Sequence, residues 1–139
     1  MTCLPDGRGN ESKTMTSRTK IFFDGGCRPN PGKMEFAVVA AGQTHIENDL
    51  GHGSSMDAEW LALIHALRTG QSLGGDFVLL GDSAAVVAQV NGKVKCRGTS
   101  VAHMETFRAL AGAAGLPNVR TIKRTQNLAG IALTKHHSG

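Results

Sequence analysis

Short apolar runs, separated by glycine, proline and polar residues, divide the chain from about residue 19 onwards. The runs TKIFF, FAVVAA and THIENDL are rich in β-branched and aromatic residues or alternate between apolar and polar positions, which predicts β-strands. Because a short turn joins the second run to the third, the three predict an antiparallel meander. The runs DFVLL and VRTI predict two more strands. The five predicted strands cover residues 19–23, 36–41, 44–50, 76–80 and 119–122.

Apolar residues three or four positions apart predict the helices. The longest such stripe comprises Met56, Trp60, Leu63, Ile64 and Leu67. It predicts a helix over residues 56–69, with Ser54 or Ser55 as the N-cap, and Asp82 is well placed to cap the next helix. Shorter helices are predicted over residues 83–90, 99–114 and 128–134. The order βββαβααβα predicts an α/β domain with a five-stranded mixed sheet, three strands antiparallel and the rest parallel, and helices on both faces.

Length and composition favour a single domain. The chain has 139 residues with 40% hydrophobic content, which suits one core, and we expect the domain to cover residues 19–139. The polar residues 1–18 predict a disordered leader. Three scattered cysteines do not form a disulfide framework or a zinc site, which favours a reducing compartment, by default the cytoplasm. No apolar run approaches membrane-spanning length, so we expect no membrane association.

The net charge of +4 is unevenly distributed along the chain. Residues 93–139 hold eight lysines and arginines against one acidic residue, Glu105, whereas residues 1–92 hold seven against ten. A basic segment of this kind can contact phosphates, and acidic residues elsewhere can hold cations. Solubilising surface charge is the alternative explanation.

Three acidic residues occupy positions where strand ends and helix starts converge. Asp24 follows the first predicted strand, Glu59 lies early in the first helix, and Asp82 follows the fourth strand. Sites in open sheets gather at such places, and burying an ionised carboxylate requires a partner. Carboxylates that meet at one point suit Mg²⁺ or Mn²⁺. For Asp24 alone, a plain Asp-Gly-Gly turn is the alternative.

Four segments carrying these acids resemble type 1 ribonuclease H, in the compact form without the basic handle. They are FFDGGCRPNPG, DAEWLALIHAL, LLGDSAAVVAQVNGKVKCRG and IKRTQNLAGIAL, and they occur in family order across roughly residues 19–135. The resemblance implies a ribonuclease H-like fold and a metal-dependent endonuclease that hydrolyses the RNA strand of RNA–DNA hybrids. In that family four acids hold two divalent ions. The first three match Asp24, Glu59 and Asp82, so the resemblance implies that these residues are catalytic and bind two Mg²⁺ or Mn²⁺ ions.

The resemblance also implies a surface that binds the RNA–DNA hybrid, on a protein expected to be monomeric. Asn30 lies in the PNPG turn, at a family position whose backbone contacts the RNA strand. Arg124 lies near the place where many members carry a mobile histidine, and arginine cannot act as a proton shuttle at neutral pH. The expected nucleic-acid-binding residues are Gly25, Gly26, Asn30, Ser55, Lys93, Lys95, Arg97, Arg124 and Asn127.

The sequence departs from the family pattern at the fourth acid. The last helix of the family begins with a pattern such as N-x-A-D, but here Asn127-Leu128-Ala129 is followed by Gly130. Glycine offers no ligand, and no aspartate or glutamate follows Glu105. The leading hypothesis is therefore a ribonuclease H whose activity Gly130 impairs. One alternative is a ribonuclease H-fold module that binds hybrid or double-stranded RNA with little cleavage. Another is a DNA-directed, integrase-like nuclease, which the PNPG turn disfavours.

Overall fold

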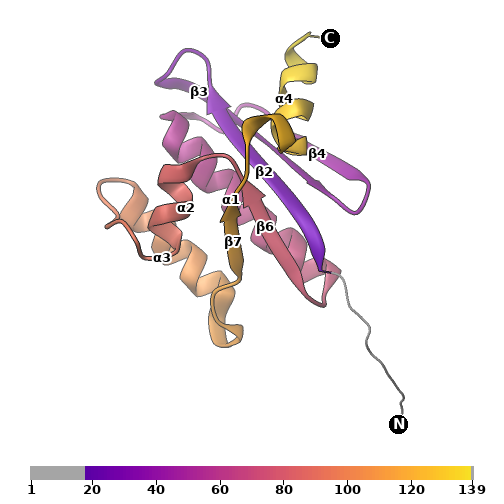
Figure 1. The fold of residues 1–139 in the computed structure, drawn as a ribbon. Coiled ribbons are helices and arrows are strands. Elements are labelled where there is room, and N and C mark those ends of the chain that lie inside the picture. Colours follow the sequence, from indigo (N-terminus) through magenta and orange to yellow (C-terminus); the bar gives the residue numbers. More distant parts are fainter. Residues whose placement is uncertain (1–17, 139) are drawn as a thin grey trace.

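The computed structural model describes residues 18–138. The leader expected over residues 1–18 lies, apart from Arg18, outside the described residues. Six strands, four α-helices and two short 3₁₀ helices follow one another along the described chain (Figure 1). In chain order they are β2 (Thr19–Cys27), β3 (Gly32–Ala40), β4 (Gln43–Glu47), β5 (His52–Gly53), α1 (Ser55–Leu73), β6 (Phe77–Gly81), α2 (Ala84–Val90), α3 (Ser100–Ala111), η1 (Gly112–Ala114), β7 (Asn118–Thr121), η2 (Arg124–Gln126) and α4 (Leu128–Ser138).

The sheet has the strand order β4-β3-β2-β6-β7, and the two-residue strand β5 pairs with β3 beside this path. Strands β2, β3 and β4 run antiparallel to one another, whereas β6 is parallel to β2 and β7 is parallel to β6. The turn between β3 and β4 is tight because Ala41 and Gly42 both take positive φ values, of 50° and 76°, as two-residue hairpins require. The predicted five-stranded mixed sheet is confirmed, and β5 is an addition that the sequence pattern missed.

Helices cover both faces of the sheet, as predicted. Figure 1 shows α1 behind the sheet and α4 in front of it. The main core lies on the α1 face, where Phe23, Trp60 and Phe107 are fully buried. Trp60 and Phe107 are therefore core residues, and the Trp60 indole nitrogen donates a hydrogen bond of 2.9 Å to the side-chain oxygen of Gln89.

The other face carries a smaller core under α4. Ala129 and Leu133 of this helix pack on Ala37 of β3, and the partly buried Phe22, Val39 and Ile46 surround them. Among residues 18–138, no helix is long and apolar enough to cross a membrane. The first turn of α4 thereby lies over the middle of β2, the strand that carries Asp24.

Two element boundaries differ from the prediction in a way that matters for the site. Strand β2 continues through Asp24 to Cys27, although the glycines after Asp24 predicted a turn there. Strand β3 begins at Gly32 and pairs with the extension, so that Glu35 lies opposite Gly26. Asp24 is therefore a mid-strand residue whose side chain projects from the α4 face of the sheet.

Candidate metal centre

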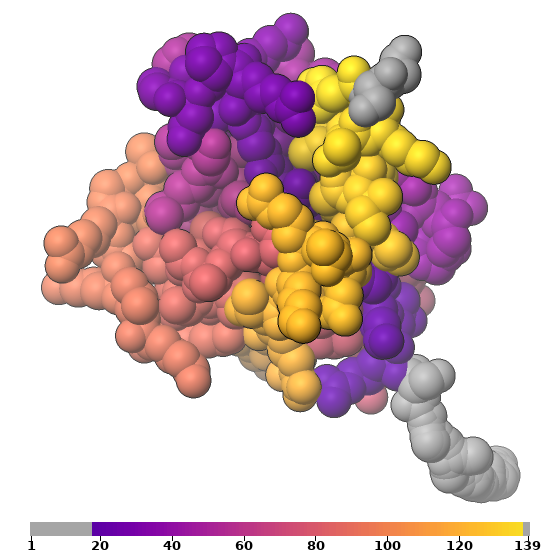
Figure 2. Space-filling model, turned by 45° about the horizontal axis from the view of Figure 1, so that its top comes forward, coloured from indigo at the N-terminus to yellow at the C-terminus, as the bar shows by residue number. Residues whose placement is uncertain are grey.

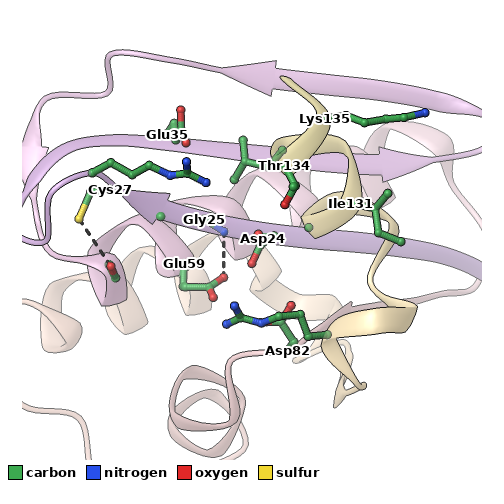
Figure 3. A pocket seen from close by; sticks show the side chains of 15 residues that line it. Asp24, Gly25, Cys27, Glu35, Glu59, Asp82, Ile131, Thr134 and Lys135 are labelled. Atoms are coloured by element: carbon green, nitrogen blue, oxygen red, sulfur yellow. Dashed lines mark hydrogen bonds between the residues drawn. The ribbon is translucent and has the colours of Figure 1, made fainter. Parts of the chain in front are cut away.

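Gly25 lets helix α1 approach strand β2 closely enough to bring Glu59 beside Asp24. A Cβ atom at Gly25 would lie 2.3 Å from the carbonyl oxygen of Ala58, which no side chain tolerates. The Gly25 amide donates a hydrogen bond of 3.0 Å to Oε1 of Glu59, drawn as a dashed line in Figure 3. The glycine after Asp24 therefore serves helix packing and carboxylate positioning rather than a turn.

The start of α1 is fixed by a capping box. The Ser54 hydroxyl accepts a hydrogen bond from the Asp57 amide, and the Asp57 carboxylate accepts one from the Ser54 amide, which confirms Ser54 rather than Ser55 as the N-cap. Asp57 also accepts a hydrogen bond from the Thr99 hydroxyl and contacts Nε2 of His103, which ties α1 to α3. Burial opposes ionisation of Asp57, but the hydrogen bonds from Thr99 and Ser54 outweigh it and lower the pKa to about 2. Glu59 follows two residues later on this rigid helix start.

Asp82 is positioned by a residue from the far end of the chain. The side-chain amide of Asn127 donates hydrogen bonds of 2.9 Å to Oδ2 of Asp82 and 3.0 Å to the carbonyl oxygen of Phe23. Asn127 is fully buried, and its side chain orients Asp82. The sequence had predicted that Asn127 binds nucleic acid, but a buried side chain is not available for that contact. Nor does Asp82 cap α2, because the Ser83 hydroxyl takes that role by accepting from the Val86 amide.

Asp24, Glu59 and Asp82 converge at one point. One carboxylate oxygen from each lies within 4.8 Å of the others, although the residues come from β2, α1 and the end of β6 (Figure 3). Burial, followed by the charge of Asp82, raises the pKa of Asp24 to about 7. Burial, followed by the charge of Asp24, raises the pKa of Glu59 to about 9. Three crowded carboxylates, two of them with a raised pKa, fit a divalent cation, which would neutralise the repulsion between them.

The three acids open into a cleft of about 510 Å³. In the space-filling view, the turn after β2, in indigo, faces the yellow α4 across this part of the surface (Figure 2). Of the predicted nucleic-acid-binding residues, Gly25, Gly26, Ser55 and Arg124 line the cleft. The sequence prediction missed Cys27, Arg28, Glu35, Ile131, Leu133, Thr134 and Lys135, which line it as well.

The other predicted binding residues lie elsewhere. Lys93, Lys95 and Arg97 are exposed on the connector between α2 and α3, away from α4, and do not line the cleft (Figures 1 and 2). The side-chain oxygen of Asn30 accepts a hydrogen bond of 3.0 Å from the Ser55 amide, which links the PNPG turn to the start of α1. Asn30 therefore lies next to the cleft without lining it.

Gly130 lies beside the acids, at the position where the sequence pattern of the family places a fourth acid. A Cβ atom added there would lie 3.4 Å from Oδ2 of Asp24 and 3.6 Å from Oδ2 of Asp82. A side chain at residue 130 would thus reach the acids without a clash, and the glycine leaves this side of the centre without a carboxylate. His137, two turns later on α4, pairs with Glu35 instead of turning to the acids.

The raised pKa values predict that pH and metal act together on stability. Unfolded carboxyls ionise near pH 4, whereas Asp24 and Glu59 keep their protons to about pH 7 and about pH 9 when folded. Because the folded chain binds more protons in this window, the stability of the metal-free chain should fall as the pH rises from about 4 to about 9. Mg²⁺ should therefore raise the melting temperature more at about pH 8.5 than at about pH 6. The two increases should differ by about 5–10 °C. Circular dichroism melts with and without MgCl₂ test this, and an equal shift at both pH values would contradict it.

A family model described as reverse transcriptase-like matches residues 23–137. The chain belongs to this family. No curated protein matches the chain. Several solved structures do, and among them are structures of ribonuclease H1 with a similar fold.

LC11-RNase H1, isolated from compost by a metagenomic approach and solved in complex with an RNA/DNA hybrid, is 27% identical to the chain. The alignment covers 80% of this chain and 89% of that one, with a TM-score of 0.69. RNase H1 from the halophilic archaeon Halobacterium salinarum is 26% identical, with coverage of 86% and 99% and a TM-score of 0.73. The N-terminal RNase H domain of a Mycobacterium tuberculosis protein has a TM-score of 0.70, coverage of 89% and 100%, and 23% identity, a likeness that concerns the fold alone.

These comparisons confirm the type 1 ribonuclease H-like fold that the four sequence segments predicted. The matched region contains Asp24, Glu59, Asp82 and Gly130. The chain is thus a reverse transcriptase-like family member with an acidic cluster that can hold a metal ion.

Proposed function

We propose that this protein is a Mg²⁺- or Mn²⁺-dependent endoribonuclease that hydrolyses the RNA strand of RNA–DNA hybrids. The convergence of Asp24, Glu59 and Asp82 within 4.8 Å in an open cleft carries the proposal. The family fold supports it, and so does the RNA/DNA hybrid in the name of the LC11-RNase H1 structure. Hybrid cleavage requires carboxylates beside a phosphate of the RNA strand, and the acids of this open cleft would meet that requirement.

The three acids would hold the divalent ion, and their geometry is prepared before it arrives. A bound divalent ion supplies Lewis-acid activation of a water molecule and of the phosphate. Gly25 fixes one oxygen of Glu59 through its amide, and Asn127 fixes one oxygen of Asp82. These bonds hold the two carboxylates in place, so little reorganisation is needed when substrate binds.

Cations around the acids would hold the phosphate backbone. Arg28, Arg124 and Lys135 line the cleft, and each can pair with a phosphate of the cleaved strand. Gly26 adds no side chain to the cleft wall, so a strand can approach β2 closely. The exposed Lys93, Lys95 and Arg97 would contact a more distant part of the duplex, because they lie outside the cleft.

A cleavage assay tests the proposal. Labelled RNA is presented as a hybrid with DNA, as single-stranded RNA and as an RNA duplex, each with Mg²⁺, Mn²⁺ or EDTA. We expect metal-dependent cuts within the RNA of the hybrid, with the DNA strand left intact. The open position at Gly130 favours a second candidate, a module that binds the hybrid without cutting it. Hybrid binding in an electrophoretic shift assay without cleavage in either metal would contradict the enzyme and support that module.

A further inference from the structure

Helix α4 offers the centre almost no ligand. Its residues that line the cleft are Gly130, Ile131, Leu133, Thr134 and Lys135. Within residues 18–138, the group of side chains that could hold an ion contains three carboxylates and no fourth. Glu35 lines the same cleft, but its carboxylate is paired with His137 and does not belong to that group. One divalent ion can use the three acids, whereas a second ion beside Asp24 would lack a carboxylate of its own.

The side chain of Arg124 lines the cleft and brings a positive charge to it. Arg124 begins η2, and its carbonyl oxygen accepts a hydrogen bond of 3.2 Å from the amide of Asn127. Asn127 is fully buried and bound to Asp82, so the backbone of Arg124 is anchored beside the acids. The positive charge of Arg124 lowers the pKa of both Asp24 and Glu59, although burial and carboxylate repulsion dominate in each. Its charge thus acts on two of the three acids at once.

The charges of the three acids and Arg124 balance with a single divalent ion. Four carboxylates require two divalent cations for neutrality, whereas three require one divalent cation and one monovalent cation. We propose that this centre binds one divalent ion and that the guanidinium of Arg124 takes the place of the second. The proposal rests on the proposed function, since it assumes that the three acids bind a divalent ion, and it replaces the two ions that the family resemblance implies. During hydrolysis Arg124 would pair with the phosphate oxygens through two parallel hydrogen bonds, as guanidinium groups do.

Calorimetric titration of the metal-free chain with Mn²⁺, without nucleic acid, tests the proposal. We expect one ion per native chain. Arg124→Gln should bind the first ion about 10-fold more tightly, because a repelling charge beside the acids has gone. Lys123→Gln is the matched control: it removes the same charge one residue earlier, from a side chain that does not line the cleft, and should leave the affinity unchanged. Circular dichroism of each variant verifies folding.

Cleavage adds an independent readout, since Arg124→Gln should lose hybrid cleavage while it gains Mn²⁺ affinity. A simple loss of structure would lower both. Two ions bound per native chain would overturn the inference and leave the proposed function standing. Equal Mn²⁺ affinities for Arg124→Gln and Lys123→Gln would refute the role of Arg124. Absence of Mn²⁺ binding by the folded native chain would overturn the inference and the metal centre together.

Discussion

Asp24→Asn is expected to abolish metal binding and to reduce hybrid cleavage by at least about 1000-fold, while the metal-free chain becomes more stable. Asp24 contributes an oxygen within 4.8 Å of those of Glu59 and Asp82, and its Oδ2 is the atom nearest to the open position at Gly130. An amide keeps the shape of the side chain but cannot balance the charge of the ion. Loss of ion binding removes the electrostatic contribution to the reaction.

The gain in stability has the same origin as the loss of activity. Burial and the neighbouring Asp82 hold the pKa of Asp24 at about 7, so an ionised Asp24 is costly without a cation. Asparagine removes the charge and part of the repulsion that raises the pKa of Glu59. We expect the metal-free variant to melt higher than the native chain at about pH 8.5, and Mg²⁺ to produce no further shift.

Asp49→Asn is the matched control for this variant. The side chain of Asp49 is 76% exposed, and its carboxylate lies 4.0 Å from the Lys33 ammonium, so the same chemical change there should leave cleavage, Mn²⁺ binding and melting unaltered. Thermal melts, Mn²⁺ titration and the hybrid assay on both variants are the measurements. Metal-dependent cleavage that survives Asp24→Asn would show that the reaction occurs at another site.

The sequence predicted the order of strands and helices because that order follows from local patterns. Strands such as residues 76–80 alternate or are continuously apolar, and the stripe at Trp60 repeats with helical spacing. The sequence also predicted the three acids of the site, because they lie at the ends of predicted strands and near the start of a predicted helix. The resemblance of the surrounding segments to type 1 ribonuclease H then placed them together, which spacing alone could not do.

The extension of β2 was missed because the packing of distant elements overrides local turn chemistry. Two glycines after an aspartate are typical of a turn. Here Gly25 is required because Ala58 of α1 lies against it, and Gly26 pairs with Glu35 in the sheet. Neither partner is visible from the residues around Asp24. The same mistake placed the start of β3 after Glu35 and so removed Glu35 from the predicted cleft.

The role of Asn127 was mistaken for a related reason. Its side chain bonds to residues 45 and 104 positions away, and it is fully buried. Asparagine before a helix commonly exposes its side chain, so its local sequence gave no signal of this burial. The position of Arg124 beside the acids likewise depends on Asn127, whose amide donates a hydrogen bond to the carbonyl oxygen of Arg124. Long-range hydrogen bonds thus orient the acids of the centre, and the local sequence does not reveal them. The hydrophobic pattern, by contrast, predicts the strands and helices that carry these acids.

Gly130→Asp is expected to increase hybrid cleavage by about 100-fold and to raise the number of bound Mn²⁺ ions from one to two. The new Cβ would lie 3.4 Å from Oδ2 of Asp24, at ordinary contact distance, so the carboxylate can extend into the centre without displacing the backbone. A second divalent ion is a stronger Lewis acid than the guanidinium of Arg124, which accounts for the faster reaction.

The matched control for this variant is Gly130→Asn, which separates charge from shape. Residue 130 lies in the first turn of α4, where either side chain favours the helix over glycine. Only aspartate adds a fourth negative charge, so metal-free Gly130→Asp should melt below Gly130→Asn at about pH 8.5, and Mg²⁺ should reverse the order. Equal cleavage rates for the two variants would contradict the prediction. They would mean that a negative charge at residue 130 does not speed the reaction, so that the missing carboxylate does not limit it.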